Sequence, residues 1–138
     1  MSEEQNCMIF DAGDFHLELR AKIYRGDPVI NNVLLYVKVE SNGFAGTMEM
    51  EVGSGELDGF IRDVLNMNKD LKGRAGIMEP YGDHCFMALE IDKSGHVMVT
   101  GMLRVSAQKL EFENSFDQTY LACLSKKLAQ TDAWQEKV

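Results

Sequence analysis

The chain has 138 residues, of which 45% are hydrophobic and 26% are charged, and it carries a formal net charge of −8 at pH 7. This length and composition predict one domain, residues 1–138, built around a single hydrophobic core. The acidic balance argues against direct binding to nucleic acid, because neutralising phosphates requires clustered Lys and Arg.

The start of the chain and the cysteines bear on where the protein works. The first residues (MSEEQNC) are acidic and polar, in contrast to the basic start of a signal peptide. No run of apolar residues reaches the roughly 18 that a membrane helix needs. Cys7, Cys85 and Cys123 are widely spaced and share no CxxC motif, which favours reduced thiols. We therefore expect a cytoplasmic protein that does not bind a membrane.

Three segments in the first half of the chain alternate apolar and polar residues, as half-buried strands do. They are residues 15–21 (FHLELRA), 33–40 (VLLYVKVE) and 45–52 (AGTMEMEV). The sequence ESNGF, residues 40–44, contains an Asn-Gly turn that is typical of a hairpin. The first half is therefore predicted to begin with antiparallel strands joined by short loops.

An amphipathic helix is predicted to follow these strands. Leu57, Phe60 and Val64 recur at helical spacing and give one apolar stripe. Ser54 stands where a helix N-cap is wanted, and Gly73 stands where a helix ends.

The second half repeats the order of strands and then a helix. Strands are predicted at residues 74–79, 85–91, 96–105 and 109–114. Residues 115–118 (SFDQ) have the form of a capping box and predict the start of a second helix. The buried side of that helix is expected to carry Tyr120, Leu121, Leu124 and Leu128.

Two similar strand-strand-strand-helix units follow from this reading. We predict an α+β domain in which an antiparallel sheet of about six to eight strands packs against two helices. The ordered core is expected to span about residues 7–130. The polar N-terminus and the C-terminal tail (TDAWQEKV) are expected to fray.

The segment EPYGDHC, residues 79–85, gathers residue types that also serve in catalysis. Pro80, Gly82 and Asp83 are turn formers between two predicted strands, so the segment is interpreted as a turn. His84 and Cys85 are neighbours on a strand and point to opposite faces, so they cannot readily pair as base and nucleophile. Cys85 alternates with apolar residues and is expected in the core.

The remaining candidates for chemistry are scattered. The histidines show no spacing typical of a zinc site, and no glycine motif for a nucleotide is present. Glu49 and Glu51 share one face of a predicted strand, which indicates a solvated face over a core. We therefore expect no catalytic residues, no cofactor and no metal, and we interpret the protein as a non-enzyme.

The order of motifs in the chain resembles the WapI-type immunity-protein family, whose namesake is the partner of the wall-associated protein A toxin. That family has a helix with an F-x-x-x-L core, a G-x-A strand, a D-x-x-G-H-V hairpin and a D-Q-(T/S)-x-L helix. The resemblance covers roughly residues 15–130. Its elements here are Phe60 with Val64/Leu65, Gly73–Ala75, Asp92–Val97 and Asp117–Leu121.

The resemblance implies a stoichiometric immunity protein that binds and neutralises a cognate bacterial toxin, with a tRNA-cleaving nuclease as the expected class. Such a toxin needs a basic face to grip RNA, and an acidic inhibitor suits that face. The expected partner-binding residues are those in the part of the chain where acidic side chains are most concentrated. They are Glu49, Glu51, Glu56, Asp58 and Asp63.

Other readings of the sequence stay open. A small-molecule-binding or self-assembling α+β domain is the main alternative, and a hydrolase-like use of His84 and Cys85 is the least favoured. Both a monomer and a homodimer are compatible with the sequence.

Overall fold

The computed structural model describes residues 7–24, 32–79 and 84–137, apart from the side chains at 84, 85, 133 and 137. Within these residues the chain forms a five-stranded sheet and a four-stranded sheet. The elements in chain order are β1 (Met8–Ala12), β2 (Phe15–Ile23), β3 (Val33–Ser41), β4 (Phe44–Val52), α1 (Ser54–Asp70), β5 (Arg74–Glu79), β6 (His84–Ile91), β7 (His96–Val105), β8 (Gln108–Asp117), α2 (Thr119–Ala129), α3 (Thr131–Trp134) and β9 (Gln135–Lys137).

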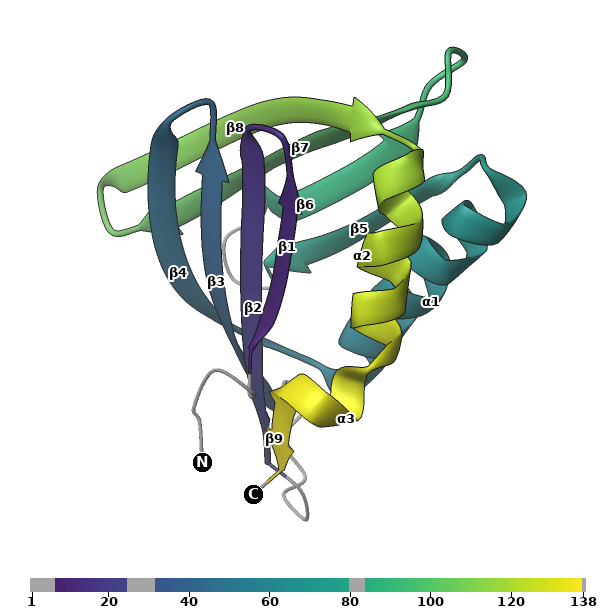
Figure 1. The fold of residues 1–138 in the computed structure, drawn as a ribbon. Coiled ribbons are helices and arrows are strands. Elements are labelled where there is room, and N and C mark those ends of the chain that lie inside the picture. The colour runs from purple at the N-terminus through teal and green to yellow at the C-terminus, as the bar shows by residue number, and fades with distance from the viewer. Residues whose placement is uncertain (1–6, 25–31, 80–83, 138) are drawn as a thin grey trace.

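The α+β prediction is confirmed, and the strands are divided between two sheets. The first sheet has the order β1-β2-β3-β4, and β9 adds to β2 in parallel; the second has the order β5-β6-β7-β8. Figure 1 shows the two sheets curving around a shared interior, with α1 and α2 beside one another along one side. Each unit has four strands before its helix. The additional strand β1 (MIFDA) gives no clear periodic signal, because its outward-facing residue Ile9 is apolar like the buried residues on either side.

The β3–β4 hairpin has the predicted Asn-Gly turn. Asn42 and Gly43 both have positive φ, 54° and 87°, as a type I′ turn requires. Beside the turn, the buried hydroxyl of Ser41 accepts a hydrogen bond of 2.9 Å from the Asn114 amide on β8. This bond ties the end of the hairpin to the second sheet.

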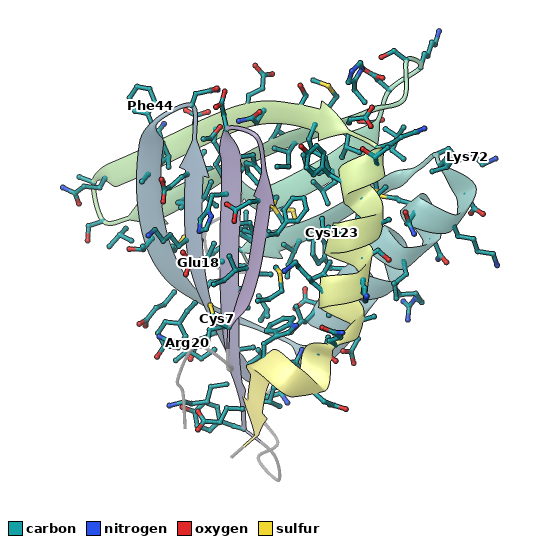
Figure 2. All side chains as sticks on the ribbon, viewed as in Figure 1. Cys7, Glu18, Arg20, Phe44, Lys72 and Cys123 are labelled. Atoms are coloured by element: carbon teal, nitrogen blue, oxygen red, sulfur yellow. The ribbon has the colours of Figure 1, made fainter. Side chains whose placement is uncertain are left out.

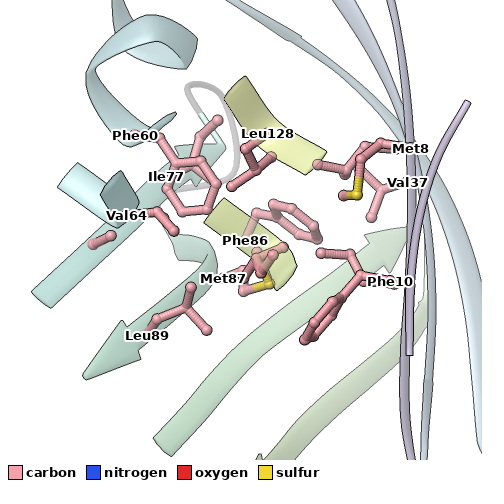
Figure 3. Close-up of a cluster of buried hydrophobic side chains, with 14 of the residues drawn as sticks. Met8, Phe10, Val37, Phe60, Val64, Ile77, Phe86, Met87, Leu89 and Leu128 are labelled. Carbon is pink, nitrogen blue, oxygen red and sulfur yellow. The ribbon is translucent and has the colours of Figure 1, made fainter. Parts of the chain in front are cut away.

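Phenylalanine rings join the two sheets in the interior. Phe10 and Phe15 of the first sheet meet Phe112 and Phe116 of the second. The ring centroids of Phe10 and Phe116 are 5.4 Å apart, and Phe15 lies 6.2 Å from both partners. Figure 3 shows that side chains from both sheets and both long helices continue this core. Aromatic pairs at these separations add to the stabilisation that burial alone supplies.

A β-bulge in β6 changes the predicted alternation. Ile77 pairs with Met87 and Met78 pairs with Cys85, so Phe86 is an extra residue on β6. The alternation that placed Cys85 in the core is therefore interrupted. Residues 80–83 of the predicted turn, and the side chains of His84 and Cys85, lie outside the described residues.

Gly101 on β7 permits the second sheet to form around this bulge. A Cβ at this position would lie 2.1 Å from the Phe86 carbonyl oxygen and 2.5 Å from the Phe112 ring. The carbonyl oxygen belongs to the backbone and the Phe112 ring is buried in the core, so a side chain here would displace backbone and core. Glycine is required here because the Phe86 carbonyl and the Phe112 ring approach the Cα closely. Its backbone conformation does not require glycine, since Gly101 is not among the residues with positive φ.

The ends of the helices differ from the predicted caps. Gly53 is the N-cap of α1, one residue before the predicted Ser54, and its N–H donates to the Glu56 carboxylate at 3.0 Å. At α2, the Asp117 carboxylate accepts hydrogen bonds from the Thr119 N–H and hydroxyl, at 3.1 and 2.6 Å. This local acceptor replaces the predicted capping box at residues 115–118.

The C-terminal segment does not fray as expected. Trp134 is only 2% exposed and belongs to the core cluster. After it, β9 pairs with β2 at Ala21–Ile23, beyond the residues that β1 covers. Burial of an indole, together with backbone pairing, therefore holds residues 131–137 on the domain.

Phe116→Ala is expected to lower the free energy of unfolding by about 3–5 kcal/mol, because it removes the ring that touches both Phe10 and Phe15. Phe44→Ala is the matched control, since that ring is 69% exposed, and it should cost well under about 1 kcal/mol. Urea unfolding of both variants measures the difference. Equal losses would show that the inter-sheet rings are not central to stability.

Gly101→Ala is expected to destabilise the fold by about 3 kcal/mol, because the added methyl overlaps the Phe86 carbonyl and the Phe112 ring. Gly55→Ala in the first turn of α1 meets no atom within 4 Å and should leave stability unchanged or raise it by up to about 1 kcal/mol. Thermal and urea unfolding of the pair are the measurements. A neutral Gly101 variant would contradict the described packing.

Candidate functional site

The side chains of β2, β3 and β4 that point away from the core form one polar surface, here called the outer face. Strand alternation and register place these side chains in four rows across the three strands. The rows are His16–Glu40–Ala45, Glu18–Lys38–Thr47, Arg20–Tyr36–Glu49 and Lys22–Leu34–Glu51.

Part of the outer face is an ionic network. His16 bridges two carboxylates, contacting Asp11 through Nδ1 and Glu18 through Nε2, the latter at 2.7 Å. The Lys38 ammonium lies 3.8 Å from Glu18 and 3.6 Å from Glu40. Charges on adjacent strands therefore restrain one another and reduce the conformational freedom of this part of the surface.

The network shifts the protonation of its members. Burial acts to lower the pKa of His16, but hydrogen bonds to Asp11 and Glu18 outweigh it, and the pKa is raised. The hydrogen bond from His16 lowers the pKa of Glu18. Burial and the nearby Glu18 charge raise the pKa of the Cys7 thiol. The arrangement favours an imidazolium between two carboxylates and disfavours a thiolate beside them.

A groove of about 600 Å³ crosses the outer face. Cys7 lines one end, and Val105 lines the other, where the β7–β8 hairpin reaches past β4 (Figure 1). Figure 2 shows Cys7, Glu18 and Arg20 close together over the first sheet. The Arg20 guanidinium lies 4.7 Å from the centre of the Tyr36 ring, in a cation–π contact. The other polar side chains that line the groove are Lys38, Thr47 and Glu49.

Several side chains that line the groove have unused hydrogen-bonding groups. Among the described residues, the side chains of Arg20, Tyr36, Thr47 and Glu49 make no ion pair or hydrogen bond with the protein. The groove can therefore offer a ligand a guanidinium, a carboxylate and two hydroxyl groups without breaking existing bonds.

The structure separates the predicted partner-binding residues into two groups. Glu49 and Glu51 are exposed on the outer face, and Glu49 lines the groove. Glu56, Asp58 and Asp63 are exposed on α1, which begins soon after β4 ends and runs beside β5 and α2 (Figure 1). Glu56 also accepts the Gly53 N–H, which gives it a structural role.

Sequence reasoning missed most of the groove. The alternation of residues 15–21 and 33–40 marked Glu18, Arg20, Tyr36 and Lys38 as the polar side of two strands. No role in binding was assigned to these four residues. The register that places Arg20, Tyr36 and Glu49 in one row is the missing information, and no local signal encodes it.

A second group of reactive residue types lies in the β6–β7 turn. The Ser94 hydroxyl donates to Asp92 at 2.7 Å and lies 2.8 Å from His96 Nδ1. In a catalytic triad the histidine lies between the serine and the acid, whereas here the serine lies between the other two. The backbone N–H groups of Ser94 and His96 also donate to Asp92, so the group organises a turn.

The described part of the chain contains no group of three His, Cys, Asp or Glu side chains placed to hold a metal ion. No described helix has the length and apolar character needed to cross a membrane.

Comparison of the chain with protein-family models, with curated proteins and with solved structures found no match in any of the three.

His16→Gln is expected to flatten the dependence of stability on pH. A raised pKa means that His16 stabilises the fold fully below the unfolded value of about 6.5, and that this contribution is lost as pH rises through the folded pKa. The unfolding free energy of the unmodified protein should therefore fall more than that of the variant between about pH 6 and pH 8. Urea unfolding across this range, with NMR titration of His16, measures it. A measured His16 pKa at or below its ordinary value would show that Asp11 and Glu18 do not raise it.

Proposed function

We propose that the protein is a stoichiometric immunity protein that binds and neutralises a cognate toxin in the bacterial cytoplasm, with no catalysis of its own. The observation that carries the proposal is the outer face, where a restrained ionic network borders a groove in which Arg20, Tyr36, Thr47 and Glu49, among the described residues, make no ion pair or hydrogen bond with the protein. A surface that is already ordered loses less conformational entropy when a partner binds.

The chemistry of the outer face favours binding over catalysis. Both ring nitrogens of His16 contact carboxylates, and its raised pKa disfavours the neutral form that a general base needs. The raised pKa of Cys7 likewise disfavours the thiolate that a nucleophile needs. These groups therefore serve better as fixed charges and hydrogen-bond partners.

Charge and the resemblance to the WapI-type family favour a toxin as the partner. A net charge of −8 would speed encounter with a basic surface such as a nuclease presents to RNA. Glu49 and Glu51 would contact the toxin, while Asp58 and Asp63 on α1 would act at longer range. A buried aromatic anchor would supply affinity, and we assign this role to Tyr36, which lines the groove on β3.

A small-molecule-binding function is the second candidate. The groove volume of about 600 Å³ lies within the range of roughly 300–1,000 Å³ that ligand pockets occupy. Its lining combines the apolar residues Leu19, Val37, Met48 and Val105 with charged and hydroxyl side chains. It lies across the open face of a sheet, which favours a flexible ligand that carries both apolar and charged groups.

Co-expression with a toxin domain encoded beside this gene tests the proposal. The expected result is restored growth and a one-to-one complex by size-exclusion chromatography with light scattering. Glu49→Lys with Glu51→Lys should weaken the complex about tenfold or more, since the double substitution removes the carboxylate contacts and reverses the charge at both positions. Asp58→Lys with Asp63→Lys is the matched control and should mainly slow association. Continued killing by an active toxin, with no complex, would reject the proposal.

A further inference from the structure

One row of side chains in the groove carries opposite charges at its two ends, and Glu18 lines the groove beside this row on β2. Arg20 on β2 and Glu49 on β4 both pair in register with Tyr36 on β3. The next row, which lies outside the groove lining, repeats the order with Lys22 on β2 and Glu51 on β4. The β2 side is therefore basic in these rows, the β4 side is acidic, and β3 separates them.

Arg20 and Glu49 stand on strands that are separated by β3 and do not pair with one another. Neighbouring strands lie about 4.8 Å apart, so the backbones of β2 and β4 are separated by roughly 10 Å. Within the described residues no ion pair joins Arg20 to Glu49. An isolated surface charge is ordinarily hydrated, but two unpaired charges across one groove can be bridged by a single ligand.

A contact with Tyr36 orients the basic group for this task. The cation–π contact with Tyr36 restrains the Arg20 guanidinium, and a guanidinium can bind a carboxylate through two parallel N–H groups. Lys38 is balanced by Glu18 and Glu40, so it does not compete as strongly for an anion. The Tyr36 and Thr47 hydroxyl groups lie in the groove and can bond a peptide backbone.

We propose that the groove binds a short zwitterionic ligand of peptide type, with its carboxylate on Arg20 and its ammonium on Glu49. Three extended residues span roughly 10 Å, about the backbone separation of β2 and β4, and this sets the length of the probe. This inference goes beyond the proposed function, because it concerns the ligand chemistry of the groove and does not depend on a toxin.

The test is an NMR titration of the ¹⁵N-labelled full chain with triglycine as the probe. Saturable shifts are expected at amides of β2, β3 and β4, with a dissociation constant on the order of mM for solvent-accessible ion pairs. N-acetyl-triglycine lacks the ammonium and triglycine amide lacks the carboxylate. Each should bind about fivefold more weakly, and glycine, whose charges are too close together, should fail to bridge the groove.

Charge exchange supplies the matched variants. Arg20→Glu or Glu49→Arg alone should weaken triglycine binding about fivefold. The double variant R20E/E49R should restore it, because the free ligand can turn end for end between exchanged charges. Amide spectra confirm that each variant is folded.

Three results would overturn the inference: no saturable shift with triglycine, equal binding of the blocked analogues, or a folded double variant that does not recover binding. Toxin rescue is measured separately, so failure in the titration leaves the proposed function standing, and failure of rescue leaves the ligand inference standing.

Discussion

The packing of Phe10 and Phe15 in the first sheet against Phe112 and Phe116 in the second joins two halves of the chain that belong to separate sheets. Each sheet buries one face in this interior, because strand alternation sends every second side chain inward. The core that results includes both long helices (Figure 3). The orientation of the outer face follows from this packing, since the opposite sides of β2, β3 and β4 are held by the core.

A sheet held in this way can present charges at set separations. The same ladder that buries Leu35 and Val37 spaces Tyr36 and Lys38 on the opposite face. The ionic network around His16 then restrains one part of that face, while Arg20 and Glu49 in the groove are left without protein ion pairs among the described residues. Binding, in this view, depends on rows of side chains whose spacing belongs to the fold and not to any local motif.

Interactions between distant segments account for the predictions that were wrong in detail. The N–H of Ser54 donates to the side chain of Asn32, so the residue predicted as an N-cap already lies inside α1. Trp134 was assigned to a frayed tail because an isolated indole near a chain end carries no periodic signal, yet the interior accepts it. The bulge at Phe86 likewise depends on Gly101 of the neighbouring strand. A local sequence pattern does not identify such partners, because they lie far away in the chain or on a neighbouring strand.

The sequence by itself determined the α+β class, both long helices and most strands, because alternation and helical spacing are local consequences of burying one face. It also marked Arg20, Tyr36 and Glu49 as polar positions on strands. Only the tertiary structure decided that the strands form two sheets, that residues 131–137 dock on the domain, and that these three side chains share one row of a groove. Register and sheet packing bring together residues far apart in the chain, and hydrophobic periodicity specifies which face is buried without specifying its partner.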